Sequence, residues 1–341
     1  MQWNTLDEDL WSVLNNKTLL ITGGTGSFGN AFVRQALKYS NCQKIIIFSR
    51  DEMKQWEMQN VFSKFSDRLR FFIGDVRDLD RLKRAFKDVD YIIHAAATKI
   101  VPTAEYNPFE CIKTNINGAM NIVDAAIDSS VSKVVALSTD KASSPVNLYG
   151  ATKLVSDKVF IAGNNYSGIQ STNFSVVRYG NVMGSRGSII PFFRSISSKS
   201  RFPITDFKMT RFMISLDDGI RLVMTALNDA VGGELYIKKI KSMYVTDIAK
   251  AINPNAKLVQ VGIRPGEKLH EQMIGIEDNI YTFEYDHYYK ILPMINNWHQ
   301  DPQRIKNGRR VDEQFVYSSN MNAEWMTVEE LQTWISSEYD D

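Results

Sequence analysis

A cluster of glycines between an apolar run and a helical pattern constrains the fold of this chain more than any other feature. Gly23, Gly24, Gly26 and Gly29 follow the apolar run at residues 18–21 and satisfy both the GxxGxxG and the GxGxxG spacing. Such glycines allow a tight turn and let the backbone approach a pyrophosphate at the N-terminus of the next helix. A glycine motif alone is weak evidence, but its position between a strand and a helix is specific. The cluster therefore predicts a dinucleotide site, with an ordinary glycine-rich turn as the alternative.

Apolar, β-rich runs alternate with helical patterns through the first half of the chain. The runs are continuous rather than alternating, which is typical of parallel strands covered on both faces. We expect strands at residues 18–21, 44–48, 69–73, 91–94, 133–137 and 174–177. We expect helices at residues 31–39, 79–86, 108–129 and 149–162. This order predicts an α/β fold with a doubly wound parallel sheet, the Rossmann domain.

The rhythm changes after about residue 180, where glycines and prolines interrupt the pattern. A later strand at residues 234–237 and a helix at 245–252 indicate a smaller C-terminal α/β unit for substrate binding. We therefore predict an N-terminal arm (1–16), a dinucleotide-binding domain (17–180) and a mainly substrate-binding domain (181–341). The division is approximate, because the chain can cross back between the two units. The last 65 residues contain no motif that predicts a role.

Composition narrows the class of protein. The net charge of +1 argues against a nucleic-acid-binding surface. No apolar run approaches the ~18 residues that span a bilayer, and the acidic start of the chain lacks the basic region of a secretory signal. Cys42 and Cys111 are expected to be reduced, partly buried thiols. We therefore expect a cytoplasmic protein that does not contact a membrane.

Arg50 follows the second predicted strand, about 20 residues after the last glycine, where the adenosine ribose is bound in this fold. An arginine there can pair with a 2′-phosphate in bidentate fashion, and Ser49 and Lys54 can add donors. NADP is therefore favoured as the cofactor. NAD stays an alternative because Asp51 is next in the sequence, and Arg50 can also be a solvated surface residue. His94 ends the fourth predicted strand and is expected to be structural.

A tyrosine, two lysines and an aspartate, all able to act as acids or bases, lie within fifteen residues. Tyr149 and Lys153 have helical i,i+4 spacing and share one face of a helix. A nearby ammonium lowers the pKa of a phenol from about 10, so Tyr149 can take a proton from an alcohol while a hydride leaves the same carbon. The additional pair Asp140 and Lys141 is more than a plain alcohol oxidation needs.

Together these residues resemble the extended short-chain dehydrogenases/reductases. More narrowly, the chain resembles the soluble UDP-N-acetylglucosamine 4,6-dehydratases that invert carbon 5 and open the pseudaminic acid pathway. The resemblance spans residues 17–275 and rests on the motifs TGGTGSFG (22–29), SRDE (49–52), GDVRD (74–78), AEYNP (104–108), STDKA (138–142), NLYGATK (147–153), RYGNV (178–182), GSRGS (184–188) and RPGEK (264–268).

Two positions sharpen the resemblance. Dehydratases that retain configuration carry Thr-Asp-Glu where this chain has Thr139, Asp140 and Lys141. Large membrane-bound relatives keep Asp-Lys but have Met at the position of Tyr149. One departure lies at Lys99, which Thr98 and Ile100 flank where the family usually has Leu and His.

The resemblance implies a mechanism. Tyr149 takes the proton of the carbon-4 hydroxyl while hydride goes to the cofactor, and Lys153 holds the ribose. Lys141 removes the carbon-5 proton if burial or Lys153 lowers the pKa of its amine. Asp140, held neutral, protonates the leaving carbon-6 hydroxyl. Hydride returns to carbon 6, a proton reaches carbon 5 from the opposite face, and Thr139 hydrogen-bonds the sugar near carbon 4.

The resemblance also implies the remaining site residues. The cofactor, a tightly bound NADP regenerated in each turnover, is expected to contact Gly23, Thr25, Gly26, Ser27, Phe28, Gly29, Ser49, Arg50, Asp51, Glu52, Lys54, Asp75, Val76, Ala95, Ala96, Ala97, Lys99, Asn115, Tyr149 and Lys153. UDP-N-acetylglucosamine is expected to contact Lys99, Thr139, Tyr149, Asn181, Arg211, Arg264 and Glu267. No metal is expected, and family members assemble as homo-oligomers, hexamers or dimers.

Two other functions stay open. A sugar-nucleotide 4-epimerase needs Tyr149 and Lys153 but not Asp140 and Lys141, and its product keeps the 6-hydroxyl. A non-catalytic NADP-sensing protein uses the same fold as a binding module, although an intact tyrosine–lysine pair argues against it.

Overall fold

The fold is built on a ten-stranded sheet with the order β16-β14-β15-β10-β6-β5-β4-β1-β2-β3. The structure, a computed structural model, describes residues 6–168, 172–185 and 187–339. The parallel strands are β1 (Thr18–Thr22), β2 (Lys44–Ser49), β3 (Leu69–Ile73), β4 (Tyr91–His94), β5 (Lys133–Thr139), β6 (Asn173–Tyr179) and β10 (Leu235–Lys238). Antiparallel strands extend one edge: β14 (Thr282–Glu284), β15 (Tyr288–Ile291) and β16 (Arg309–Arg310).

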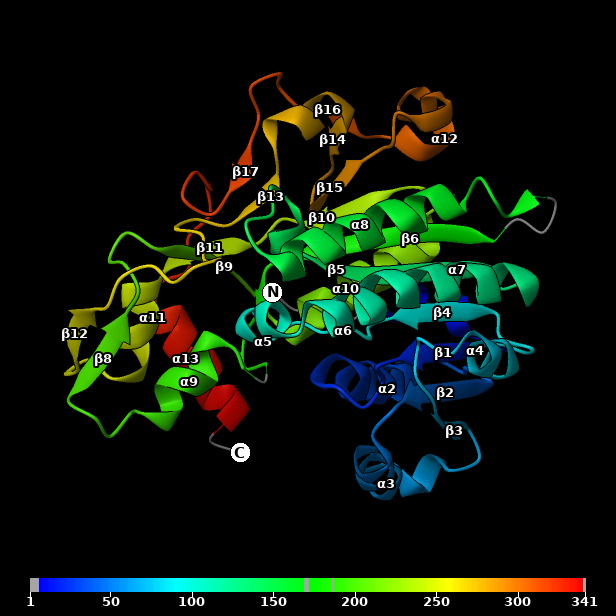
Figure 1. The fold of residues 1–341 in the computed structure, drawn as a ribbon, viewed down its shortest axis with the longest axis horizontal. Coiled ribbons are helices and arrows are strands. Elements are labelled where there is room, and N and C mark those ends of the chain that lie inside the picture. The colour runs from blue at the N-terminus through cyan, green and yellow to red at the C-terminus, as the bar shows by residue number, and fades with distance from the viewer. Residues whose placement is uncertain (1–5, 169–171, 186, 340–341) are drawn as a thin grey trace.

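Helices cover the sheet in two layers. Figure 1 shows α7 and α8 crossing the face of the sheet that is turned to the viewer. One layer, whose members contact one another, contains α4 (Leu79–Ala85), α7 (Gly118–Asp128) and α8 (Leu148–Gly163). The other contains α1 (Leu6–Trp11), α2 (Ser27–Tyr39) and α10 (Leu216–Asp229), and α3 (Glu52–Val61) packs at β2 and β3. This arrangement confirms the predicted doubly wound α/β fold.

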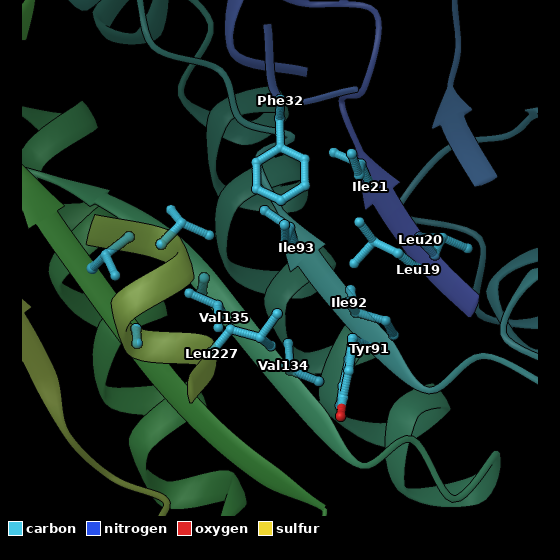
Figure 2. Close-up of a cluster of buried hydrophobic side chains, with 14 of the residues drawn as sticks. Leu19, Leu20, Ile21, Phe32, Tyr91, Ile92, Ile93, Val134, Val135 and Leu227 are labelled. Carbon is cyan, nitrogen blue, oxygen red and sulfur yellow. The ribbon is translucent and has the colours of Figure 1, made fainter. Parts of the chain in front are cut away.

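The core lies between these layers, and the strand sequences explain it. Leu19, Leu20 and Ile21 of β1 are all fully buried, because neighbours cover both faces of the strand. Figure 2 shows them beside Phe32 of α2 and the inner strands. Continuous apolar runs were therefore the correct signal for these strands.

The helix predicted at residues 108–129 is interrupted. The chain forms α6 (Pro108–Ile112), a π-helical turn (Lys113–Asn117) and then α7. Such turns inside a helix are rare and occur often at functional sites. This turn carries Asn115, one of the residues expected at the cofactor.

A smaller unit follows β6 and has its own apolar core, which includes Phe193, Phe202, Met243 and Ile248. Its helices are α9 (Ile189–Ser195), α11 (Val245–Ile252) and α13 (Val328–Tyr339), which lie together on the left of Figure 1. Its strands are β7 (Asn181–Val182), β8 (Arg201–Ile204), β9 (Thr210–Ile214), β11 (Lys241–Tyr244) and β12 (Lys257–Gln260). The strands β13 (Gln272–Ile274) and β17 (Tyr317–Ser318) pair with each other and pack against the large core. Since β10 and β14–β16 join the large sheet, the chain after residue 180 contributes to both units.

The N-terminal arm packs on the large unit. Trp11 is 2% exposed and its ring lies 5.2 Å from that of Phe32 in α2, centre to centre. Residues 1–5 of the arm and Arg186 of the GSRGS motif lie outside the described residues. Among the helices that the structure describes, none combines the length and apolar character needed to cross a bilayer.

Candidate active site

A cavity of about 1340 Å³ lies along the carboxyl ends of the parallel strands and extends to the small unit. Ligands of open α/β sheets bind in this place. The substrate residues predicted from the sequence all line it: Lys99, Thr139, Tyr149, Asn181, Arg211, Arg264 and Glu267. Most of the predicted cofactor residues line it as well, and the exceptions are Gly29, Glu52 and Asn115.

The turn between β1 and α2 presents free backbone donors to the cavity. Gly23 has a φ of +66°, which favours glycine, and a side chain there would meet the Ala96 nitrogen at 2.8 Å. Gly26 precedes α2 and gives no side-chain cap, so the first N–H groups of the helix remain available to an anion. Gly29 instead lets the helix pack on the turn, since its Cβ would lie 2.1 Å from the Gly24 oxygen. These features fit a dinucleotide pyrophosphate.

Arg50 and Asp51, the two candidates for contact with the adenosine ribose, follow β2 and differ in how free their side chains are. The Asp51 carboxylate caps α3 by accepting the Lys54 N–H at 3.0 Å, and it also pairs with the Lys54 amine at 2.8 Å. Arg50 has a side chain 62% exposed, and its ion-pair partner among the described residues is Asp75 at 3.7 Å. The guanidinium is thus freer to meet a ligand than the Asp51 carboxylate. Glu52 lies exposed in the first turn of α3.

Asn115 supports the cavity wall from behind. Its amide oxygen accepts the Thr98 N–H at 2.8 Å, and its amide nitrogen donates to the Thr98 carbonyl at 2.9 Å and the Thr152 hydroxyl at 3.0 Å. These bonds tie the loop after β4 to α8. Lys99, the next residue of that loop, lines the cavity, and burial lowers the pKa of its amine.

Tyr149 and Lys153 lie at the start of α8, where Asn147 caps the helix by accepting the Gly150 N–H at 2.8 Å. The expectation that Lys153 lowers the pKa of Tyr149 is wrong for this structure. Burial raises the pKa of the phenol to about 12, against the opposing effects of Lys141 and Thr139. The Lys153 amine donates to the Leu137 carbonyl at 2.8 Å, and burial lowers its own pKa.

Lys141 lines the cavity from a short helical turn after β5, and Asp140, which the sequence also predicted as catalytic, does not line it. The Asp140 carboxyl is fully buried behind the lining, and one oxygen accepts from the Thr139 hydroxyl at 2.9 Å and the Lys141 amine at 3.1 Å. Burial raises the pKa of Asp140, although Lys141 opposes the rise. Burial therefore favours the neutral form of this carboxyl, whereas the Lys141 ammonium favours the carboxylate.

The pKa of Lys141 differs from our expectation of a lowered value. Burial does disfavour the ammonium, but the carboxylates of Asp140 and Glu271 together outweigh burial and raise the pKa of Lys141. Glu271 lies 3.4 Å from the Lys141 amine, and so does the Asn181 amide oxygen.

The opposite wall comes from the small unit. Arg211 is 9% exposed, and it donates to the carbonyls of Thr210 at 2.7 Å and Lys268 at 3.1 Å. Arg264 and Glu267 lie on the turn before Lys268, and their side chains approach to 4.0 Å. The sequence analysis missed Lys268 and Glu271 as site residues. Both line the cavity. Lys268 is the last residue of the RPGEK motif and Glu271 follows three residues later, which was the available signal in the sequence.

Comparisons with known proteins agree with this geometry. Residues 19–293 match the family described as polysaccharide biosynthesis protein. The chain is 52% identical to the inverting UDP-N-acetylglucosamine 4,6-dehydratase of Campylobacter jejuni, over 94% of this chain and 97% of that protein. It is 43% identical to the UDP-glucose 4-epimerase of Rickettsia bellii, over 81% of this chain and 83% of that protein.

Two solved structures extend the comparison. The X-ray structure of Pen from Bacillus thuringiensis superposes with a TM-score of 0.86 at 34% identity, over 95% of this chain and 98% of Pen. DesIV, a dTDP-glucose 4,6-dehydratase from Streptomyces venezuelae with NAD and TYD bound, gives a TM-score of 0.65 at 25% identity, over 74% of this chain and 86% of DesIV.

Proposed function

The chain belongs to the polysaccharide biosynthesis protein family and, within it, to the inverting UDP-N-acetylglucosamine 4,6-dehydratases, and from this premise we propose its reaction. The protein converts UDP-N-acetylglucosamine to UDP-2-acetamido-2,6-dideoxy-β-L-arabino-hex-4-ulose with loss of one water. It is therefore a hydro-lyase, and we place this step first in pseudaminic acid synthesis. The observation that carries the proposal is Lys141 and Tyr149 on the lining of one cavity, with the buried Asp140 carboxyl 3.1 Å behind the Lys141 amine.

Tyr149 is the proposed base for the carbon-4 hydroxyl. The phenol lines the cavity, and Thr139 hydrogen-bonds it from the end of β5. The turn between β1 and α2 would hold a nicotinamide dinucleotide, which would supply the hydride acceptor for carbon 4 and the hydride donor for carbon 6. Because burial holds the Tyr149 pKa high, the residue needs a positive charge close to its oxygen when it accepts the proton. The Lys153 ammonium, one helical turn away, is the proposed source, provided that it turns from the Leu137 carbonyl.

Asp140 and Lys141 are the proposed acid and base of the elimination. The 3.1 Å contact between them allows one proton to pass from the ammonium to the carboxylate, which leaves a neutral amine and a neutral acid. The amine then takes the carbon-5 proton, and the acid gives its proton to the carbon-6 hydroxyl, which leaves as water. A proton added to carbon 5 from the opposite face completes the inversion.

We propose NADP as the cofactor and assign the 2′-phosphate to Arg50. The exposed guanidinium supports this choice, and Ser49 and Lys54 line the same end of the cavity. The engagement of Asp51 as the cap of α3 also supports it, because a ribose diol would need that carboxylate.

The small unit is proposed to bind the UDP-sugar. Arg211 and Arg264 suit a diphosphate through bidentate hydrogen bonds, and Glu267 and Asn181 suit hydroxyl groups. We also propose a cytoplasmic homo-oligomer, a hexamer or a dimer. Two buried free thiols support a reducing compartment. Tyr106, 88% exposed, and Phe109, 75% exposed, offer apolar surface that an assembly contact would cover.

The mass of the product tests the reaction. The purified protein is mixed with UDP-N-acetylglucosamine without added cofactor, and the product is analysed by mass spectrometry. The proposal expects a product lighter by one water. A product of unchanged mass would instead support the 4-epimerase, a candidate favoured by the 43% identity to the Rickettsia enzyme. Retained cofactor without turnover would support the sensing protein.

A further inference from the structure

Glu271 is a buried acid that the proposed chemistry does not use. It directly precedes β13, is 2% exposed and lines the cavity. One carboxylate oxygen lies 3.4 Å from the Lys141 amine and 3.7 Å from the Arg211 guanidinium. The other is buried and has no hydrogen-bond partner among the described residues. Burying a carboxylate costs free energy unless cations compensate it. Lys141 and Arg211 provide that compensation here, so the charge of Glu271 is tied to the charge of Lys141.

Lys141 lies between two carboxylates, Asp140 at 3.1 Å and Glu271 at 3.4 Å. When Asp140 becomes a neutral acid, Lys141 loses one counter-ion but keeps the other. The negative charge of Glu271 also disfavours a second negative charge on Asp140. The charge of Glu271 therefore raises the pKa of both Asp140 and Lys141.

We propose, on the basis of the dehydratase function above, that Glu271 is a positioning residue of the elimination. It keeps the Lys141 amine at the cavity floor and, as the second negative charge of the cluster, keeps one proton on the pair of Asp140 and Lys141. The other charged groups that face this cluster are Arg211 and Lys268, which compensate Glu271. The neutral Tyr149 hydroxyl also lies near Asp140.

The C-terminal segment holds Glu271 in place. The Ser319 hydroxyl accepts the Glu271 N–H at 2.9 Å, and the Ser319 N–H donates to the Glu271 carbonyl at 2.8 Å. The same hydroxyl bonds to that of Thr210 at 2.7 Å, and β17 pairs with β13. Ser319 belongs to the last 65 residues, for which the sequence predicted no role, and it thus fixes the backbone of Glu271.

The pH dependence of kcat tests this role. The pair of Asp140 and Lys141 must carry one proton, which sits on Asp140 in the active form, so activity is present below the pKa at which the pair loses that proton and falls as pH rises through that value. Glu271→Gln keeps the size of the side chain but removes its charge. We expect the high-pH limb of kcat to move down by about one pH unit, in line with the effect of a nearby like charge. Above the limb, the variant is then about tenfold slower than the wild type, since one unit changes the protonated fraction tenfold.

Two further variants complete the experiment. Glu271→Asp keeps the charge, so its high-pH limb stays within a few tenths of the wild-type position even where kcat drops. Glu284→Gln removes a charge from an exposed ion pair with Lys239 and leaves the profile unchanged. A uniform loss at all pH values in both Glu271 variants, with no shift of the limb, overturns the proposal and leaves Glu271 as a structural residue.

The proposed function is tested separately by the wild-type protein in the same series. If the wild type forms no dehydrated product, the dehydratase function is refuted, and the role of Glu271 with it. If the wild type forms that product and Glu271→Gln keeps the wild-type limb, only the role of Glu271 is refuted. If Glu271→Gln does not fold, the limb of Glu271→Asp decides: a downward shift despite the retained charge refutes the role.

Discussion

Replacing Asp140 by asparagine removes the proposed acid of the elimination and changes little else. The amide oxygen of asparagine can still accept the hydrogen bonds of Thr139 and Lys141, which measure 2.9 Å and 3.1 Å in the native protein. The fold and the carbon-4 oxidation should therefore persist. The elimination loses both the acid for the carbon-6 hydroxyl and the acceptor of the Lys141 proton.

The burial of Asp140 sets the size of the effect. A general acid typically contributes about 10²–10⁴-fold in rate, which corresponds to roughly 2.7–5.4 kcal/mol of activation free energy. The Asp140 carboxyl is fully buried, so bulk water does not readily replace it as the acid. We therefore expect Asp140→Asn to lower kcat by about 10³-fold or more.

Two measurements separate this effect from unfolding. Mass spectrometry follows the loss of water, and the absorbance of the reduced cofactor follows the oxidation of carbon 4. The variant should accumulate reduced cofactor, because oxidation proceeds while elimination stalls. Asp67→Asn, a change on an exposed loop, serves as the matched control. Turnover of Asp140→Asn within a few-fold of the wild type refutes the reasoning.

Two other residues give independent predictions. Arg50→Ala should weaken NADP binding by about 10- to 100-fold and leave NAD binding unchanged by calorimetry, and an equal loss for both cofactors contradicts the assignment. His94 is buried and neutral, and its pKa is lowered to about 3 by burial and by Lys153. The unfolded chain therefore takes up the proton at a higher pH than the folded protein does. The free energy of unfolding thus falls as pH drops below about 6.5. From pH 7 to pH 5 this costs about 2 kcal/mol; His94→Gln should remove that share of the change in urea unfolding, and an identical change in both proteins counts against it.

The sequence predicted the parallel sheet because its signals are local. Buried strands require continuous apolar runs, as in β1, and the glycine turn after it has few alternatives. The break at Lys113–Asn117 was not predictable in this way. It depends on Asn115 reaching Thr98 and Thr152, which are distant in sequence or on another helix.

The composition of the cavity was largely predictable from motifs, but its electrostatics were not. Tyr149 and Lys153 were expected to interact because they lie one turn apart. Their pKa values depend on burial and on the direction of the Lys153 amine, which a carbonyl of β5 determines. Glu271 lies 130 residues after Lys141 in the sequence, and only the tertiary structure brings the two together.

The configuration at carbon 5 tests the central claim most directly. The wild-type protein is incubated with UDP-N-acetylglucosamine in deuterated water, and the product is examined by nuclear magnetic resonance and mass spectrometry. The account predicts a 4-keto-6-deoxy sugar with one deuterium at carbon 5 and the inverted configuration at that carbon. A product without the label, or a labelled product with the original configuration, would contradict the account.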